Sequence, residues 1–366
     1  MSNEFLSIKN IARQALPRLI ENLVFPNLIY KDYSNEYEVG KGATIQVRKP
    51  VILTATEFNA GSGVSAQDVK EESVDVTLDK LATVDVEFGA IARATSVDDL
   101  NRLFIEPAAA ALAEKINSDG LELYKDIPYN VGTAGTTPTT LAIFADAAKA
   151  LDIAKVPTAM RRGVWDPTAM AAFRQIGDIV NAEKSGTTEA LRAGSIGNIF
   201  GIDNYMAQGV KINTNVGAGT VKIDNASGYN AGDTVIHVDG VTTALAAGDC
   251  IKIGDYLYTV KTAGDLSTAD QDLTLTYGLL AGVADNADVT MVAATNNMVF
   301  HQNAFAFVTR PLAAPAGVES YTTSYNGITL RVVRGYNMQY KKEMLSMDVL
   351  YGYKTMYPEL AVRALG

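Results

Sequence analysis

The clearest hydrophobic pattern lies between Ser96 and Pro128, where apolar residues recur at steps of three and four. This spacing places them on one face of an α-helix. Pro107 is tolerated only in a first helical turn, so the pattern predicts a short helix over about 97–104 and a main helix over about 106–127. The residues expected to form the buried core of the main helix are Ile105, Leu112, Ile116 and Leu123.

A second pattern, strict alternation of apolar and polar residues, occupies the last part of the segment 51–92. It predicts β-strands. The polar stretch 54–69 before it has no core of its own, and an isolated two-stranded ribbon is marginal in water. If the ribbon projects, its apolar side needs a partner surface, such as another subunit; an ordinary strand in the home domain is the alternative, and the pattern alone fits both. The residues expected at this contact are Phe58, Gly61, Gly63, Val74, Val76, Leu78, Val84, Val86 and Phe88.

Further helices and strands are predicted along the rest of the chain. Residues 3–24 and 141–154 carry helical patterns, and 42–50 alternates like a short strand. Asp166 followed by Pro167 is typical of a helix N-cap and first turn. The mixture predicts an α+β fold.

The composition changes in residues 216–293. This segment contains no Glu, Arg or Pro, and its three lysines against ten aspartates give a net charge of −7. Short apolar runs alternate there with Gly- and Asp-rich turn signals, which indicates strands. Because mixed α/β character returns afterwards, we expect an inserted, small all-β domain.

Composition narrows the functional classes. With 366 residues, 48% of them hydrophobic, the chain is long enough for more than one domain. A net charge of −10 argues against a surface that wraps nucleic acid. The single cysteine, Cys250, excludes an internal disulfide framework. We expect no signal peptide, because the N-terminal MSNEFLSIKN has no basic region leading into an apolar core. We expect no membrane span, because no apolar run approaches about 20 residues.

Motifs that carry chemistry are missing from the sequence. Its two histidines, His237 and His301, are far apart, and no His, Cys or carboxylate cluster has metal-ligand spacing. There is no phosphate-binding GxxxxGK[ST] and no GxSxG nucleophile motif. We therefore expect no enzyme activity, no catalytic residues, no cofactor and no metal site.

Ordered blocks of sequence resemble the major capsid (coat) proteins of tailed bacteriophages with the HK97-like fold. The blocks are IARQALPRLIENLVFPNLIYKDYSNEYEVGKGATIQVRKP, VPTAMRRGVWDPTAMAAF, GSIGNIFGIDNYMAQGV, FHQNAFAFVTRPL and GITLRVVRGYNMQYKKEMLSMDVLYGYKTMYPELAVRALG. The resemblance extends over nearly all of the chain outside 216–293, and it is to the podovirus coat-protein branch that carries an inserted β-domain.

The resemblance implies an HK97-like division of the chain. The implied parts are an N-arm (1–40), a peripheral domain with a spine helix (41–49 and 93–129), an extended loop (50–92), an axial domain (130–215 and 294–334), the inserted β-domain (216–293) and peripheral-domain strands (335–366).

The resemblance also implies a function. The chain would self-assemble, as hexamers and pentamers, into an icosahedral shell that encloses double-stranded DNA without binding it specifically. A separate scaffolding protein and a portal would be partners, no membrane would be involved, and the virion capsid would assemble in the bacterial host cytoplasm. Two alternatives stay open: an encapsulin-type nanocompartment shell, and a surface-binding protein whose β-domain recognises a ligand.

Overall fold

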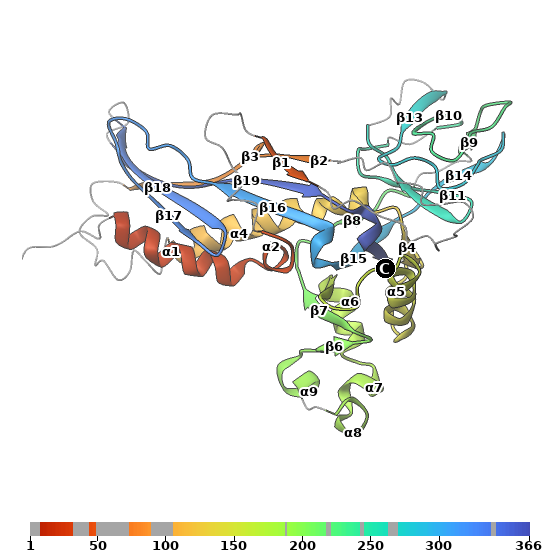
Figure 1. The fold of residues 1–366 in the computed structure, drawn as a ribbon, viewed down its shortest axis with the longest axis horizontal. Helices are drawn as coiled ribbons and strands as arrows, with labels where there is room; N and C mark the ends of the chain where they lie inside the picture. The colour runs from red at the N-terminus through yellow and green to blue at the C-terminus, as the bar shows by residue number, and fades with distance from the viewer. Residues whose placement is uncertain are drawn as a thin grey trace, which may run out of the picture. The chain divides into compact units, whose positions relative to one another are not determined.

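The computed structural model describes residues 8–31, 44–48, 73–88, 105–186, 189–216, 221–241, 245–262, 270–337 and 342–366 (Figure 1). Contacts divide the chain into two units. Unit 1 comprises Met1–Pro17, Lys31–Ala108 and Ala306–Met356. Unit 2 comprises Arg18–Tyr30, Ala109–Phe305 and Tyr357–Gly366. Each unit is therefore assembled from segments that are distant in sequence.

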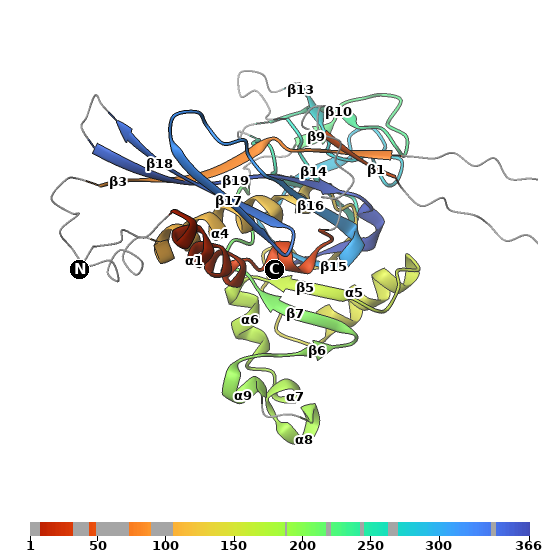
Figure 2. The same ribbon diagram turned by 60° about the vertical axis from the view of Figure 1, so that its left-hand side comes forward.

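Unit 1 is built on a five-stranded sheet. In both views its strands β17, β18 and β19 run side by side (Figures 1 and 2). The strand order is β16-β19-β18-β17, and β3 also pairs with β19. The strands are β3 (Lys80–Phe88), β16 (Phe305–Arg310), β17 (Glu319–Tyr325), β18 (Ile328–Asn337) and β19 (Lys342–Thr355).

The β17–β18 hairpin follows from its turn residues. Asn326 and Gly327 both have positive φ, at 52° and 73°. A two-residue hairpin turn with this backbone favours Asn-Gly, and its twist matches that of the flanking strands. The antiparallel register continues from there, with Tyr325 opposite Ile328 and Glu319 opposite Arg334.

Alternating residues of this sheet bury one face. On β18 and β19 the buried apolar residues occur at every second position, as the strand period requires. They are Ile328, Leu330, Val332, Leu345, Met347, Val349 and Tyr351. A side chain at Gly352 would collide with the carbonyl oxygen of Thr77. Glycine at this position therefore lets the chain after β2 (Ser73–Thr77) cross β19 closely.

Two helices contain residues of both units: α1 (Ile8–Asn22) and α4 (Glu106–Leu121). The main helix predicted over 106–127 is confirmed as α4 followed by a 3₁₀ turn, η4 (Glu122–Asp126). Ile105, Leu112 and Ile116 are buried as expected. Leu123 is only half-buried. The tighter winding of a 3₁₀ helix changes which residues share a face, and Tyr124 is buried in its place. The short helix predicted over 97–104 lies outside the described residues.

Unit 2 contains a seven-stranded sheet with strand order β4-β20-β15-β5-β7-β6, in which β8 also pairs with β15. The strands are β4 (Asn130–Gly132), β5 (Arg161–Trp165), β6 (Asn198–Ile199), β7 (Ile202–Met206), β8 (Ile212–Asn213), β15 (Ala294–His301) and β20 (Ala361–Leu365). The helices of this unit are α2 (Phe25–Leu28), α5 (Ala142–Ile153), α6 (Pro167–Phe173), α7 (Gly177–Val180), α8 (Ala182–Ser185) and α9 (Glu189–Ala193).

Three aromatic rings pack against one another in the hydrophobic core at this sheet. Phe144, Trp165 and Phe173 are fully buried, with ring centroids 4.6–5.1 Å apart. The predicted N-cap is confirmed: the Asp166 carboxylate accepts hydrogen bonds from two backbone N–H groups in the first turn of α6, and Pro167 is the first helical residue. The cap fixes where α6 starts and so brings Phe173 against the sheet.

The second sheet of unit 2 is six-stranded and antiparallel, with order β12-β11-β14-β9-β10-β13. Its strands are β9 (Val221–Ile223), β10 (Val235–Asp239), β11 (Cys250–Ile253), β12 (Tyr256–Thr259), β13 (Gln271–Thr274) and β14 (Asp288–Met291). They enclose a hydrophobic cluster of their own. The segment expected to be all-β therefore has strands joined by turns, and no helix, among its described residues. Contacts nevertheless keep it in unit 2, and 216–293 as a separate domain stays a prediction.

Two expected boundaries do not follow the sheets of the structure. The axial range 294–334 ends inside β18, which is one strand of unit 1 paired along its length with β17 and β19. The last range, 335–366, contains β19 of unit 1 but also β20, which joins the sheet of unit 2 through β15 and β4. Both differences arise because strand partners are distant in sequence, and the division into domains stays a prediction.

Candidate functional site

The candidate contact region begins with a two-stranded ribbon in unit 1. β1 (Thr44–Arg48) pairs antiparallel with β2, from Thr44 opposite Thr77 to Arg48 opposite Ser73. Three of the expected contact residues, Phe58, Gly61 and Gly63, fall in 49–72, outside the described residues.

Burial along β2 corrects part of the expected contact. Val76 and Leu78 are 0% and 5% exposed within the chain itself. They are therefore already covered and are not available to another subunit. Val74 is half-buried, while Asp75 and Thr77 are exposed. Of the three apolar positions expected on β2 and just after it, only Val74 keeps accessible surface for a partner.

β3 corrects the expected extent of the loop. The range 50–92 was expected to project, yet β3 pairs with β19 over nine positions, from Lys80 opposite Tyr351 to Phe88 opposite Glu343. Val84 and Val86 are half-buried on the same face as the buried Ala82. The alternative reading, an ordinary strand in the home domain, is therefore correct for these residues. The side chain of Phe88 is not among those described.

Polar interactions also tie β19 to its neighbours. Arg331 Nε donates to Asp348 Oδ2 at 3.0 Å across the β18–β19 pair, where the two residues are directly opposite. The Asp348 side chain is 6% exposed, and Ser346 Oγ donates to its other oxygen at 2.8 Å. Lys342 pairs with Glu87 on β3 at 2.6 Å, with both side chains close to half exposed. Among the described residues the sheet thus contains a buried ion pair, Arg331–Asp348, and an exposed one, Lys342–Glu87.

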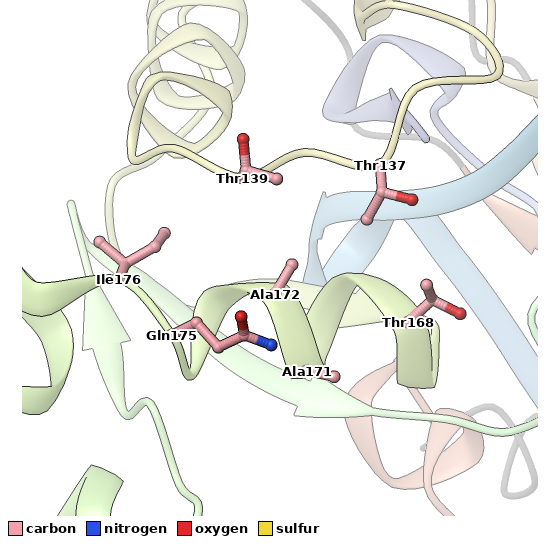
Figure 3. A pocket seen from close by; sticks show the side chains of 7 residues that line it. All are labelled: Thr137, Thr139, Thr168, Ala171, Ala172, Gln175 and Ile176. Carbon is pink, nitrogen blue, oxygen red and sulfur yellow. The ribbon is translucent and has the colours of Figure 1, made fainter.

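A shallow hollow of about 480 Å³ lies in unit 2 between the Thr137–Thr139 loop and α6 (Figure 3). Its lining consists of three threonines, two alanines, Gln175 and Ile176. The close-up shows the Thr139 and Gln175 side chains at its two sides (Figure 3). None of these lining side chains titrates near neutral pH, so the hollow offers no general acid or base.

The two histidines lie on different sheets. His237, on β10, is bonded to Asp272 at 2.7 Å, and this hydrogen bond raises the pKa of the His237 imidazole. Burial lowers the pKa of His301, on β15, and the nearby Arg161 and Arg162 lower it further. Within the described part of the chain, no group of three or more His, Cys, Asp or Glu side chains is placed to hold a metal ion.

The sequence patterns do not predict the exposure of two residues, an exposed leucine and a buried arginine. Leu81 is 51% exposed on the polar face of β3, where alternation places polar residues. Arg363 is 0% exposed in the middle of β20. A charged residue inside an apolar strand is the only signal for Arg363, and it does not say what the side chain meets. Among the helices that the structure describes, none is long and apolar enough to cross a membrane.

No protein-family model matches the sequence, and no curated protein matches it. The structure does match solved structures. One is a chain from Mycobacterium phage Che8, with a TM-score of 0.54, 17% identity, and coverage of 93% of this chain and 90% of that one. Another is a chain in the capsid structure of the cyanophage P-SCSP1u, with a TM-score of 0.50, 14% identity, and coverage of 93% and 87%. The chain has an HK97-like capsid fold.

The HK97-like fold confirms the α+β class and extends over both units, because the matches cover 93% of the chain. At these identities the likeness concerns the fold. It therefore says where the elements lie and leaves the roles of individual residues to the chemistry of this chain.

Proposed function

We propose that this chain is a major capsid protein that self-assembles, as hexamers and pentamers, into an icosahedral shell enclosing double-stranded phage DNA. The supporting observation is the HK97-like fold, which covers 93% of the chain and 87% of a chain in a phage capsid structure. The role is structural and not enzymatic.

The contact chemistry that we propose centres on the β1–β2 ribbon and residues 49–72 beyond it. Val74 keeps accessible apolar surface at the end of β2. A subunit in a closed shell contacts several copies of itself, and such obligate interfaces bury more apolar area than transient ones. We assign Phe58, Gly61, Gly63 and Val74 to the contact with a neighbouring subunit.

The proposed partners follow from the shell. They are other copies of this chain, a scaffolding protein, a portal and the packaged DNA, in a virion capsid assembled in the bacterial host cytoplasm. A net charge of −10 supports a wall that does not hold DNA tightly. The described residues also lack a cluster of potential metal ligands.

Electron microscopy of the purified chain, alone and co-expressed with a candidate scaffolding protein, tests the proposal. We expect closed shells for the wild type, and a folded subunit without shells for Val74→Asp. Asp75→Ala, on the exposed face of the same strand, is the matched control and should still assemble. A wild-type chain that stays monomeric in both settings would overturn the proposal. Particles that enclose a cargo protein would support the nanocompartment instead.

A further inference from the structure

Arg363 lies on the second strand of the seven-stranded sheet, between the edge strand β4 and β15. It lies on β20, opposite Met298 of β15 and Asn130 of β4, and its backbone N–H donates to Tyr129 at 2.8 Å. Its flanking residues, Val362 and Ala364, are buried in the core of this sheet. The backbone of Arg363 thus belongs wholly to the seven-stranded sheet.

The side chain of Arg363 ends elsewhere, on the six-stranded sheet. Nη1 donates to Thr259 Oγ1 at 3.0 Å, and Nη2 donates to Leu257 O at 2.9 Å and to Tyr277 Oη at 2.8 Å. Leu257 and Thr259 belong to β12, the edge strand of that sheet. The Tyr277 hydroxyl in turn donates to Leu257 O. One residue of β20 therefore joins the two sheets.

The charge of Arg363 is buried without an opposite charge. Among the residues that the structure describes, no carboxylate pairs with it, and its Nε has no hydrogen-bond partner. Burying an ion without a counter-ion is costly. The planar guanidinium nevertheless matches several acceptors at once, as a single ammonium group cannot. An apolar residue of similar length would avoid the cost but would not specify one arrangement of the two sheets.

A second contact holds the same hairpin. Tyr124, in η4, is buried and donates from its hydroxyl to Gly248 O at 2.8 Å, just before β11. Burial raises the pKa of both Tyr124 and Tyr277, the latter to about 12. Both hydroxyls therefore stay protonated near neutral pH and remain available as donors. The β11–β12 hairpin is held from two separate elements of unit 2.

We propose that Arg363 is the positioning residue that fixes the six-stranded sheet to the seven-stranded sheet, so that the two unfold as one. The guanidinium sets their arrangement because its three strong acceptors lie on β12 and beside it. This inference goes beyond the shell proposal and does not depend on it.

Urea unfolding of the full chain, followed by two local probes, tests this inference. Trp165, the only tryptophan, reports on the seven-stranded sheet by fluorescence, and hydrogen exchange of residues 250–260 reports on the six-stranded sheet. The two midpoints should coincide in the wild type. In Arg363→Met, residues 250–260 should lose protection at a lower urea concentration than Trp165. Coinciding midpoints in this variant would overturn the proposal.

Control variants separate positioning from general destabilisation. Val362→Ala, on the same strand and 1% exposed, should lower both midpoints together. Arg363→Lys keeps the positive charge but loses the planar guanidinium with its several donors. It should therefore separate the two unfolding midpoints as Arg363→Met does. Coinciding midpoints in Arg363→Lys would overturn the role of the guanidinium. If Arg363→Met does not fold, Tyr277→Phe and Thr259→Val each remove one acceptor. Each should separate the midpoints in part, and full coincidence in both would count against the proposal.

Discussion

Asn117 of α4 binds the backbone of Phe25 at the start of α2: its Oδ1 accepts a hydrogen bond from the Phe25 N–H at 3.2 Å. The same oxygen accepts from the Val24 N–H at 3.0 Å, and Nδ2 donates to Asn22 O at 3.1 Å. One side chain therefore pairs the backbone groups that are left open where α1 ends and α2 begins.

Replacing Asn117 tests this anchor. Asn117→Ala should destabilise unit 2 by about 2 kcal/mol, because part-buried backbone groups lose their partners. Hydrogen exchange should rise first in residues 22–28, and the measurement is exchange combined with urea unfolding. Asn22→Ala is the control and should change little, because the Asn22 side chain donates an exposed hydrogen bond to Arg18 O. Unchanged exchange in Asn117→Ala would contradict the prediction.

The buried ion pair of unit 1 predicts a large effect for a single substitution. Arg331→Met leaves the Asp348 carboxylate buried without its cation, so we expect a loss of about 3 kcal/mol in the free energy of unfolding. Lys342→Met breaks an exposed pair and should cost less than about 1 kcal/mol. Denaturant unfolding of both variants gives the comparison. The double variant Arg331→Met/Asp348→Asn should recover part of the loss in unfolding free energy. Equal losses for Arg331→Met and Lys342→Met would contradict the prediction that the buried pair matters more.

His301 predicts a dependence of stability on pH. Its folded pKa is below the ordinary value of 6.5, so the unfolded chain binds the proton more readily. The stability contribution of a neutral His301 is therefore full above pH 6.5 and is lost as pH falls through 6.5 toward the folded pKa. His301→Asn keeps an acceptor for the Asn303 N–H and should remove this loss. The measurement is the wild-type minus variant unfolding free energy between about pH 5 and 8; a flat difference would disprove the prediction.

Two deletions distinguish the loop from the sheet. Removing 54–69, which takes out Phe58, Gly61 and Gly63, should leave the unfolding midpoint unchanged and abolish shells. Removing 54–88 should unfold unit 1, because β3 supplies nine paired positions to the sheet. Circular dichroism and electron microscopy of both variants are sufficient. Shells from the shorter deletion would show that the proposed contact lies elsewhere.

Features set by residues close together in the sequence could be predicted from it, and features set by residues far apart in the sequence could not. α4 and the Asp166 cap were predictable, because helical spacing and capping are set by residues within one or two turns. The alternation that gives β3 was also visible, but its partner was not. Alternation of apolar and polar residues shows which side chains of a strand share a face of the sheet. It does not show which strand pairs with it at its edge. Here that strand is β19, more than 250 residues away in the chain.

The candidate site was less predictable for the same reason. Val76 and Val74 have the same residue type on the same face of β2, yet the first is fully buried and the second is not. Only the tertiary structure around them makes that difference. Arg363 shows the limit most clearly, because its acceptors lie 86 to 113 positions away. The fold class followed from local pattern, while the junction between the sheets required the structure.

The nine-position register between β3 and β19 also has a mechanical consequence. β2 leads into β3 after a two-residue break at Leu78 and Asp79. A pull on the ribbon reaches the sheet through Lys80, the first residue of β3. The component of that pull along the axis of β3 loads its nine-position ladder with β19 in shear, so these hydrogen bonds share the force. A component across the strands would open them one at a time, so the attachment of the ribbon resists an axial pull better than a transverse one.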